Sequence, residues 1–149
     1  CCKAVGQQRF SFMIFAGTQV LMDIEPLLGL IYGWQYLHLH THNLIGATLI
    51  GSIALLIGKS ISQWVLRSIL NDRDWSISWR TAAISAYIGS FSHILLDAFM
   101  HHDVYWFYPW ILKNPLLGLI PYSVIFYSCM CAILVGGFGF YLCKYKNES

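Results

Sequence analysis

The sequence predicts an all-α, multi-pass membrane protein with about four transmembrane helices. Hydrophobic residues make up 57% of the 149 residues and charged residues only 11%, a balance that soluble domains seldom show. The hydrophobic residues also gather in long runs, which are typical of helices that cross a bilayer. We therefore expect a single membrane-embedded domain that comprises residues 1–149.

Four runs of the chain are candidates for membrane spans. They cover residues 10–33, 43–58, 81–100 and 116–143. The first run contains Asp23 and Glu25, and Pro26 favours a bend there because proline lacks a backbone N–H. The second run is short, since its apolar stretch ends at Ile57, and it needs flanking turns to cross a hydrocarbon core about 30 Å thick. Pro121 interrupts the fourth run near its start.

The two longer connections between the runs differ in composition. Residues 59–80 are polar, but apolar positions within residues 61–70 recur near helical spacing, which predicts a helix lying flat on the membrane surface. Residues 101–115 are rich in aromatic side chains, as expected of a loop at the membrane–water interface. With four spans, these two connections lie on opposite sides of the membrane.

The basic residues predict the orientation. Eight of the nine Lys and Arg residues fall on one side, and Lys113 alone falls on the other. The eight are Lys3, Arg9, Lys59, Arg67, Arg73, Arg80, Lys144 and Lys146. Because basic loops stay in the cytoplasm, we expect both termini to be cytoplasmic. A net charge of only +2 gives no reason to expect a nucleic-acid partner.

All six histidines fall in two short stretches, residues 38–42 and residues 93–102. In a helix, His93, Asp97 and His101 would share one face, because they are spaced four residues apart. Imidazole and carboxylate groups on one face form a ligand set for a divalent metal ion such as zinc. The topology places both stretches at the outer membrane face, with four of the seven acidic residues at or below it. These four are Asp23, Glu25, Asp97 and Asp103.

This ligand set predicts hydrolytic chemistry. A charged group in the hydrocarbon region is costly, so Asp97 needs a partner, and a metal ion supplies one. Water bound to zinc ionises near neutral pH and can attack an ester or a phosphoester. Carboxylates outside the ligand set can orient a ligating imidazole or act as a general base. We therefore expect a metal-dependent hydrolase that acts on lipid or lipid-linked phosphoesters at the outer leaflet of the lipid bilayer.

Other interpretations of the same residues remain open. A membrane transporter or a metal-sensing protein would use the same cluster, because ionisable groups within a membrane also mark ion pathways. A structural membrane subunit with incidental histidines is a further alternative. Taken singly, His102 reads as an ordinary surface residue, and His40 could face away from its neighbouring histidines. Asp23 and Glu25 could simply pair with arginine or cap a broken helix.

Several spaced blocks of the sequence resemble the YdjM-like family of inner-membrane, metal-dependent hydrolases. The blocks are Asp23-x-Glu25-Pro26-Leu27, His38-x-x-Thr41-His42-x-x-x-Gly46-Ala47, Ser92-His93-x-Leu95-Leu96-Asp97-x-x-Met100-His101-x-Asp103-Val104, and Pro109 with Asn114-Pro115-Leu116. The resemblance extends from about Phe10 to Gly118. It implies a multi-pass protein with a metal site, related to the all-helical zinc-dependent phospholipases C and nucleases.

The resemblance also implies roles for individual residues. The metal ligands would be His38, His42, His93, Asp97 and His101. The supporting catalytic carboxylates would be Asp23, Glu25 and Asp103. The chain departs from the family at His40, where an apolar or aromatic residue is commoner. Such proteins usually open with a short segment containing proline and histidine, so we expect that a short N-terminal segment is missing here.

Overall fold

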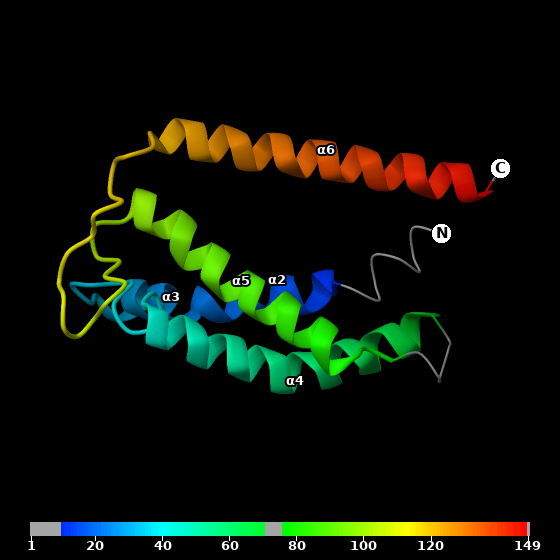
Figure 1. Cartoon of the computed structure of the whole chain (residues 1–149), viewed down its shortest axis with the longest axis horizontal. Helices are drawn as coiled ribbons and strands as arrows, with labels where there is room; N and C mark the ends of the chain where they lie inside the picture. Colours follow the sequence, from blue (N-terminus) through cyan, green and yellow to red (C-terminus); the bar gives the residue numbers. More distant parts are fainter. Residues whose placement is uncertain (1–9, 71–75, 149) are drawn as a thin grey trace.

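Every regular element in residues 10–70 and 76–148, which the computed structural model describes, is an α-helix. The helices, labelled as in Figure 1, are α2 (Phe12–Met22), α3 (Ile24–Tyr32), α4 (Leu44–Leu70), α5 (Trp79–Met100) and α6 (Tyr122–Glu148). The predicted all-α class is therefore confirmed.

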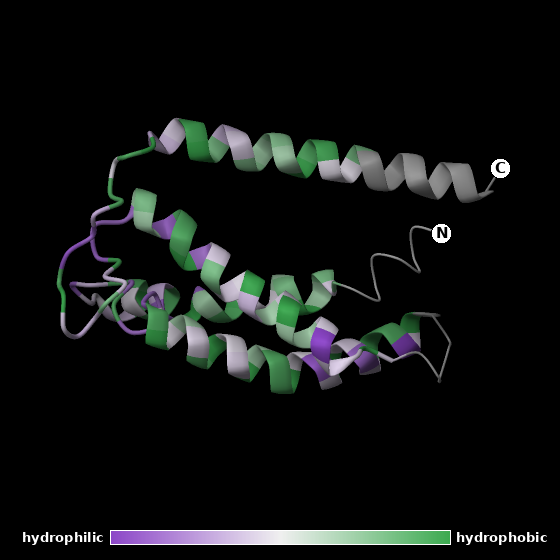
Figure 2. Cartoon of the chain, viewed as in Figure 1, coloured by the Kyte–Doolittle hydropathy of each residue, from purple (hydrophilic) through white to green (hydrophobic). Residues whose placement is uncertain are grey.

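Length and composition identify the helices that can cross a membrane. Within the described residues three stretches qualify, namely Phe12–Tyr32, Leu44–Ile69 and Trp79–Met100, and α6 contributes a shorter apolar stretch, Tyr122–Phe138. Figure 2 shows hydrophobic residues along the middle of the helices and hydrophilic residues towards both ends of the bundle. The fold is that of a multi-pass helical membrane protein, with three to four spans.

The first span is broken at Asp23, so it consists of α2 followed by α3. The backbone N–H of Asp23 bonds to the carbonyl oxygen of Gln19 at 3.2 Å and closes α2. Pro26 lies in the first turn of α3, where its missing N–H removes no bond, because the first N–H groups of a helix have no partner within it. The helix is interrupted within the predicted region, but the interruption lies at Asp23 rather than at Pro26.

Helix α4 runs past the predicted end of the second span at residue 58. Residues 59–70 contain neither glycine nor proline, so no residue there ends the helix. Lys59 Nζ donates to Gln63 Oε1 at 3.2 Å and lies 4.5 Å from the centre of the Trp79 ring. The helix predicted for residues 61–70 therefore exists, but as a continuation of α4 and not as a separate surface element.

The fourth span starts later than predicted. Residues 116–120 form turns, and α6 begins after Pro121, whose carbonyl oxygen accepts the N–H groups of Val124 and Ile125 at 2.9 and 3.3 Å. Among the described side chains of α6, only Ile125 is buried. Figure 1 shows α6 running alongside the other helices as the outermost member of the bundle.

Helices α2, α4 and α5 pack around small residues. Buried alanines of this core are Ala47, Ala54, Ala82, Ala86 and Ala98. A Cβ atom at Gly51 would lie 2.8 Å from the Tyr87 ring and 2.9 Å from Ser90 Oγ. The hydroxyl groups of Ser52 and Tyr87 are 2.9 Å apart and join α4 to α5. Such close contact between small residues is usual where membrane helices pack.

The connectivity separates the two polar ends of the molecule. Figure 1 shows the last turns of α4 and the start of α5 at one end, and the loops of residues 33–43 and 101–121 at the other. Lys59, Arg67 and Arg80 belong to the first end and Lys113 to the second. Of the remaining basic residues, Lys3, Arg9 and Arg73 lie outside the described residues, as do the side chains of Lys144 and Lys146. The two histidine stretches meet at the second end.

Candidate metal centre

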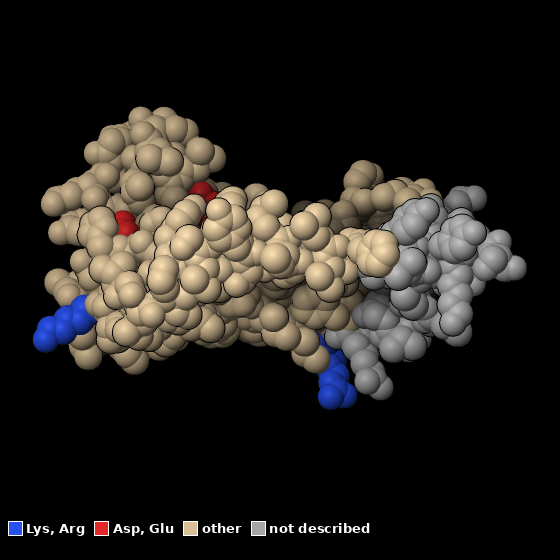
Figure 3. Space-filling model, turned by 90° about the horizontal axis from the view of Figure 1, so that it is seen from above, with Lys and Arg blue, Asp and Glu red and all other residues tan. Residues whose placement is uncertain are grey.

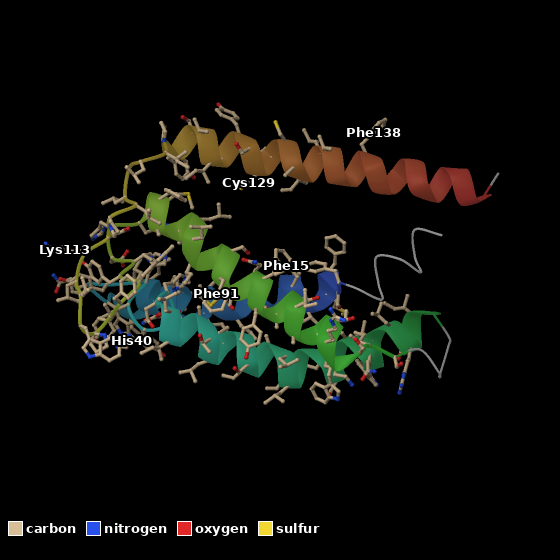
Figure 4. All side chains as sticks on the ribbon, viewed as in Figure 1. Phe15, His40, Phe91, Lys113, Cys129 and Phe138 are labelled. Carbon is tan, nitrogen blue, oxygen red and sulfur yellow. The ribbon has the colours of Figure 1, made fainter. Side chains whose placement is uncertain are left out.

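Three segments bring together four of the five predicted ligands and Asp23, which the resemblance gives as a supporting carboxylate. The α2–α3 junction supplies Asp23, the loop before α4 supplies His38 and His42, and α5 supplies His93 and Asp97. Figure 4 labels His40 of the first loop and Lys113 of the aromatic loop at this same end of the bundle. Residues as far apart in the sequence as Asp23 and His101, which are separated by 78 positions, thus converge as predicted.

Asp97 lies at the middle of the group. Its Oδ2 is 3.0 Å from His93 Nε2 and 3.2 Å from His42 Nε2. His93 Nε2 is also 3.3 Å from Asp23 Oδ1. The side chain of His42 is completely buried, whereas that of Asp23 is 63% exposed. Asp23 therefore closes the group on its open side.

The donor atoms form three overlapping sets, and within each set all atoms lie within 4.8 Å of one another. The sets are Asp23 with His42 and His93, His38 with His42 and Asp97, and His38 with His101 and Asp103. Because the sets share His38 and His42, the donors form one continuous group.

His101 reaches this group from beyond the end of α5. The helix ends at Met100, and His101 is its C-cap, with an extended backbone (φ −112°, ψ 130°). The predicted helical face therefore does not include His101, because the helix stops one residue short of it. The ring of His101 nevertheless stacks on that of His38, with 4.2 Å between the ring centres.

Asp103 holds His38 in place. Its Oδ2 accepts the backbone N–H groups of Leu37 and His38 at 2.7 and 3.1 Å, and its Oδ1 lies 3.1 Å from His38 Nδ1. Burial raises the pKa of Asp103, but the Leu37 N–H and the His38 contacts outweigh it, so the pKa is below its ordinary value. These contacts favour an orienting role; the catalytic role stays a prediction.

Glu25 organises the loop that carries the histidines. Its Oε1 accepts the His40 N–H at 2.8 Å, and its Oε2 accepts both the N–H and the hydroxyl of Thr41 at 2.6 Å. His40 Nδ1 lies 2.8 Å from Oε1. Both oxygens are thus engaged with the loop, so Glu25 fixes the backbone next to His42, and its catalytic role stays a prediction.

The hydrogen bonds around the rings determine which nitrogen faces inward. His42 Nδ1 lies 2.9 Å from the Thr41 hydroxyl, whose proton goes to Glu25, so the hydroxyl accepts from Nδ1–H. His93 Nδ1 lies 2.5 Å from Gln19 Oε1 and donates to it. With a proton on each Nδ1, the Nε2 atoms of His42 and His93 present lone pairs to Asp97.

Among the described residues, the Nε2 atoms of His42 and His93 are the two buried side-chain nitrogen or oxygen atoms that make no hydrogen bond. An unpaired polar atom in a buried position is costly, and native proteins rarely leave one unexplained. A cation bound between the two nitrogens and Asp97 would satisfy all three groups. The residues present therefore fit a divalent metal ion.

His38 and His42, two of the three histidines in the loop before α4, have opposite pKa shifts. For His42, burial lowers the pKa, but the contacts with Asp97 and Glu25 outweigh it, so the pKa is raised. For His38, burial and the neighbouring His42 and His101 rings lower the pKa more than Asp103 raises it. In the metal-free protein, the proton is therefore held more tightly by His42 than by His38.

Some residues play parts that the sequence analysis did not assign. Gln19 and Thr41 accept hydrogen bonds from the rings of His93 and His42. In the sequence, the only sign of this role is that each is a polar residue within or beside an apolar run. His40 is 69% exposed and belongs to none of the three donor sets, and His102 is also exposed and outside them. These positions agree with the interpretation of His102 as a surface residue.

Fold and site together define a multi-pass helical membrane protein with a candidate metal centre at one end of its bundle. The chain belongs to the family described as a domain of unknown function (DUF4184), whose model matches residues 27–149. No curated protein and no solved structure matches the chain. The matched range includes His38, His42 and the α5 ligands, while Asp23 and Glu25 precede it. The resemblance to the YdjM-like family stays a prediction.

Proposed function

We propose that the protein is a membrane-bound, metal-dependent hydrolase. The observation that supports this best is the pair of buried, unbonded Nε2 atoms of His42 and His93, which face Asp97 Oδ2 at 3.2 and 3.0 Å. Two imidazoles and a carboxylate are a common ligand set of catalytic zinc, which keeps a further position open. Zinc is accordingly the proposed metal.

The chain's own residues would divide the work. His42, His93 and Asp97 would hold the ion, while His38 and His101 offer further donors next to them. A divalent ion in this position supplies Lewis acidity and lowers the pKa of water. Asp23 stands at the exposed side of the group, where it is accessible to a substrate and can accept a proton.

The proposed substrates are lipid or lipid-linked esters and phosphoesters. Helix α3 directly follows Asp23 and exposes the apolar side chains of Leu27, Leu30 and Ile31, which a bilayer would cover. Figure 3 shows acidic side chains recessed in the surface near the loop end of the molecule. The open side of the group thus adjoins a helix suited to lipid contact, and in the proposed topology it would lie near the depth of the headgroups.

The proposed location is the inner (plasma) membrane, with both termini cytoplasmic and the metal centre at the outer face. The support is the excess of basic residues at the end of the bundle away from the histidines. Single cysteines at Ser68 and His102, in a background without the native cysteines, should label from opposite sides of the membrane. Labelling of both from one side would contradict the proposed topology.

The test of the function is elemental analysis of the detergent-purified protein, combined with hydrolysis of a panel of esters and phosphoesters. Wild type should contain zinc and hydrolyse a member of the panel. His93→Ala should lose both, whereas His102→Ala, an exposed histidine outside the donor sets, should keep both. Metal binding without hydrolysis would favour the transporter or metal-sensing alternative, and absence of bound metal from wild type would contradict the metal centre itself.

A further inference from the structure

Gln19 of α2 is a polar residue that contacts a ligand ring of the metal group from another helix. Its amide oxygen lies 2.5 Å from His93 Nδ1, and its amide nitrogen donates to the carbonyl oxygen of Gly89 at 3.1 Å. We infer that Gln19 is a positioning residue, which fixes the His93 ring as the Nδ1-protonated tautomer and so directs the Nε2 lone pair towards the metal ion. This inference rests on the proposed metal centre.

The direction of the Gln19 amide follows from its partners. The Gly89 carbonyl can only accept, so the amide group that faces it must be the NH₂. The amide oxygen is then left to face His93 Nδ1, and it can only accept from an N–H there. His93 therefore carries its neutral-state proton on Nδ1, because the two partners of Gln19 leave no other arrangement.

The backbone of α5 makes this contact possible. A Cβ atom at Gly89 would lie 2.9 Å from Thr18 Cβ and 3.3 Å from the Phe15 carbonyl oxygen, so only glycine lets α2 approach this closely. Figure 4 labels Phe15 on this part of α2. The Ser11 N–H bonds to Ser85 Oγ at 2.7 Å and holds the same two helices together nearer their other ends.

The position of Gln19 in the sequence fits this role. It lies one helical turn before Asp23, so both side chains are on the face of α2 that meets the metal group. An amide within an apolar helix is costly unless its polar atoms are bonded, and here both are. The contacts thus account for a polar residue in a span that is otherwise apolar.

An acceptor that holds the outer nitrogen of a metal-binding imidazole contributes to metal affinity. Removing one typically weakens metal binding or activity by about 10–100-fold. Gln19→Leu removes the acceptor and keeps the bulk of the side chain. Gln19→Glu keeps an oxygen beside Nδ1, so it should preserve the tautomer that Gln19→Leu loses. Its second oxygen replaces the donor to Gly89 and faces that carbonyl oxygen, so the variant should also be less stable than wild type.

The experiment measures tautomer and metal affinity separately on the full chain. The His93 ring nitrogens are observed by ¹⁵N NMR in the metal-free protein, with the signals assigned by their absence in His93→Ala. Zinc affinity is measured by competition with a chelator. The matched control is Gln63→Leu, since Gln63 lies on α4 and contacts Lys59 rather than the metal group.

Wild type, Gln19→Glu and Gln63→Leu should show His93 with the proton on Nδ1, and their zinc affinities should agree within a few-fold. Gln19→Leu should show a mixture of tautomers and about 10–100-fold weaker zinc binding. An unchanged tautomer in Gln19→Leu would overturn the inference, whatever its affinity. Because the tautomer is read without metal, failure of wild type to bind zinc would contradict the proposed function separately. Rescue by Gln19→Glu distinguishes positioning from a general folding defect.

Discussion

His93 and Asp97 lie one turn apart on α5, with His93 Nε2 3.0 Å from Asp97 Oδ2, yet this nitrogen has no hydrogen bond. The same oxygen faces the equally unbonded Nε2 of His42 at 3.2 Å. When both rings are neutral, three electron-rich atoms therefore meet in a buried place, where they repel one another unless a proton or a metal cation lies between them.

Asp97→Asn should separate metal binding from stability. At a pH high enough for His42 to be neutral, an NH₂ group in place of Oδ2 can donate to the Nε2 atoms of His42 and His93, so the metal-free variant should be more stable than metal-free wild type by about 1–3 kcal/mol. At lower pH this gain should be lost, because the variant lacks the carboxylate that stabilises protonated His42. Zinc binding should fall, because the amide supplies no negative charge. Thermal unfolding with and without zinc measures both effects. Full metal content in the variant would show that Asp97 is not a ligand.

Glu25→Gln should loosen the histidine loop. The new NH₂ group would face N–H or O–H donors of His40 and Thr41, and each unpaired buried donor costs about 1–3 kcal/mol. We expect a lower unfolding temperature and weaker zinc binding. His40→Ala, which removes an exposed ring, is the control and should have little effect. If Glu25→Gln keeps its unfolding temperature and its zinc but loses hydrolysis, Glu25 is catalytic, as the sequence resemblance implies.

Zinc affinity should fall as the pH is lowered, and the fall should begin at a pH above the ordinary pKa of histidine. The pKa of His42 is raised in the metal-free protein, so a larger fraction of this ligand is protonated near neutral pH, and the metal must displace the proton. The same raised pKa gives the metal-free protein stability that is present below the unfolded-state value and is lost as the pH rises through the folded-state value.

Calorimetry checks the pH prediction. Titration with zinc at neutral pH, in two buffers with different ionisation enthalpies, gives the number of protons released. We expect release in wild type and less release in His42→Ala. Equal release from both proteins would show that another group supplies the protons.

Gly46→Ala should displace the histidine loop from α4. A Cβ atom there would overlap the His40 carbonyl oxygen and lie 2.7 Å from both Cα and the carbonyl oxygen of Thr41. These are backbone atoms, which move only together with the loop, so we expect destabilisation of about 1–3 kcal/mol and weaker zinc binding. Gly17→Ala is the matched control, because nothing lies within 4 Å of its Cβ position. It should be neutral or slightly stabilising in thermal unfolding.

The spans and the convergence of the ligands could be predicted because each depends on a local signal. Apolar runs mark the helices, and the four-residue spacing of His93 and Asp97 puts them on one face whatever surrounds them. The end of α5 could not be predicted, because His101 continues the same spacing although the helix stops before it. The continuation of α4 to Leu70 could not be predicted either, because the charged residues from Lys59 onward suggest the end of a span although the helix continues.

The surroundings of the ligands depend on tertiary contacts that no sequence pattern records. Asp103 and Glu25 are carboxylates that lie near Asp97, yet their oxygens accept hydrogen bonds from backbone N–H groups of the loop. Gln19 reaches His93 across 74 residues of chain, and only because Gly89 lets two helices touch. A sequence shows which groups can bind a metal. Which of them become ligands and which hold the ligands in place depends on the helix faces that meet in the folded protein.

The ligand donors are spread over three successive spans, and this has a consequence for biogenesis. Asp23 enters the bilayer with the first span and His42 precedes the second, while His93 and Asp97 arrive with the third. A nascent chain that ends before α5 lacks His93 and Asp97, so it does not contain the complete set of donors. Ion uptake would therefore follow insertion of α5, and with the proposed topology the ion would come from the outer compartment rather than from the cytoplasmic pool available during translation.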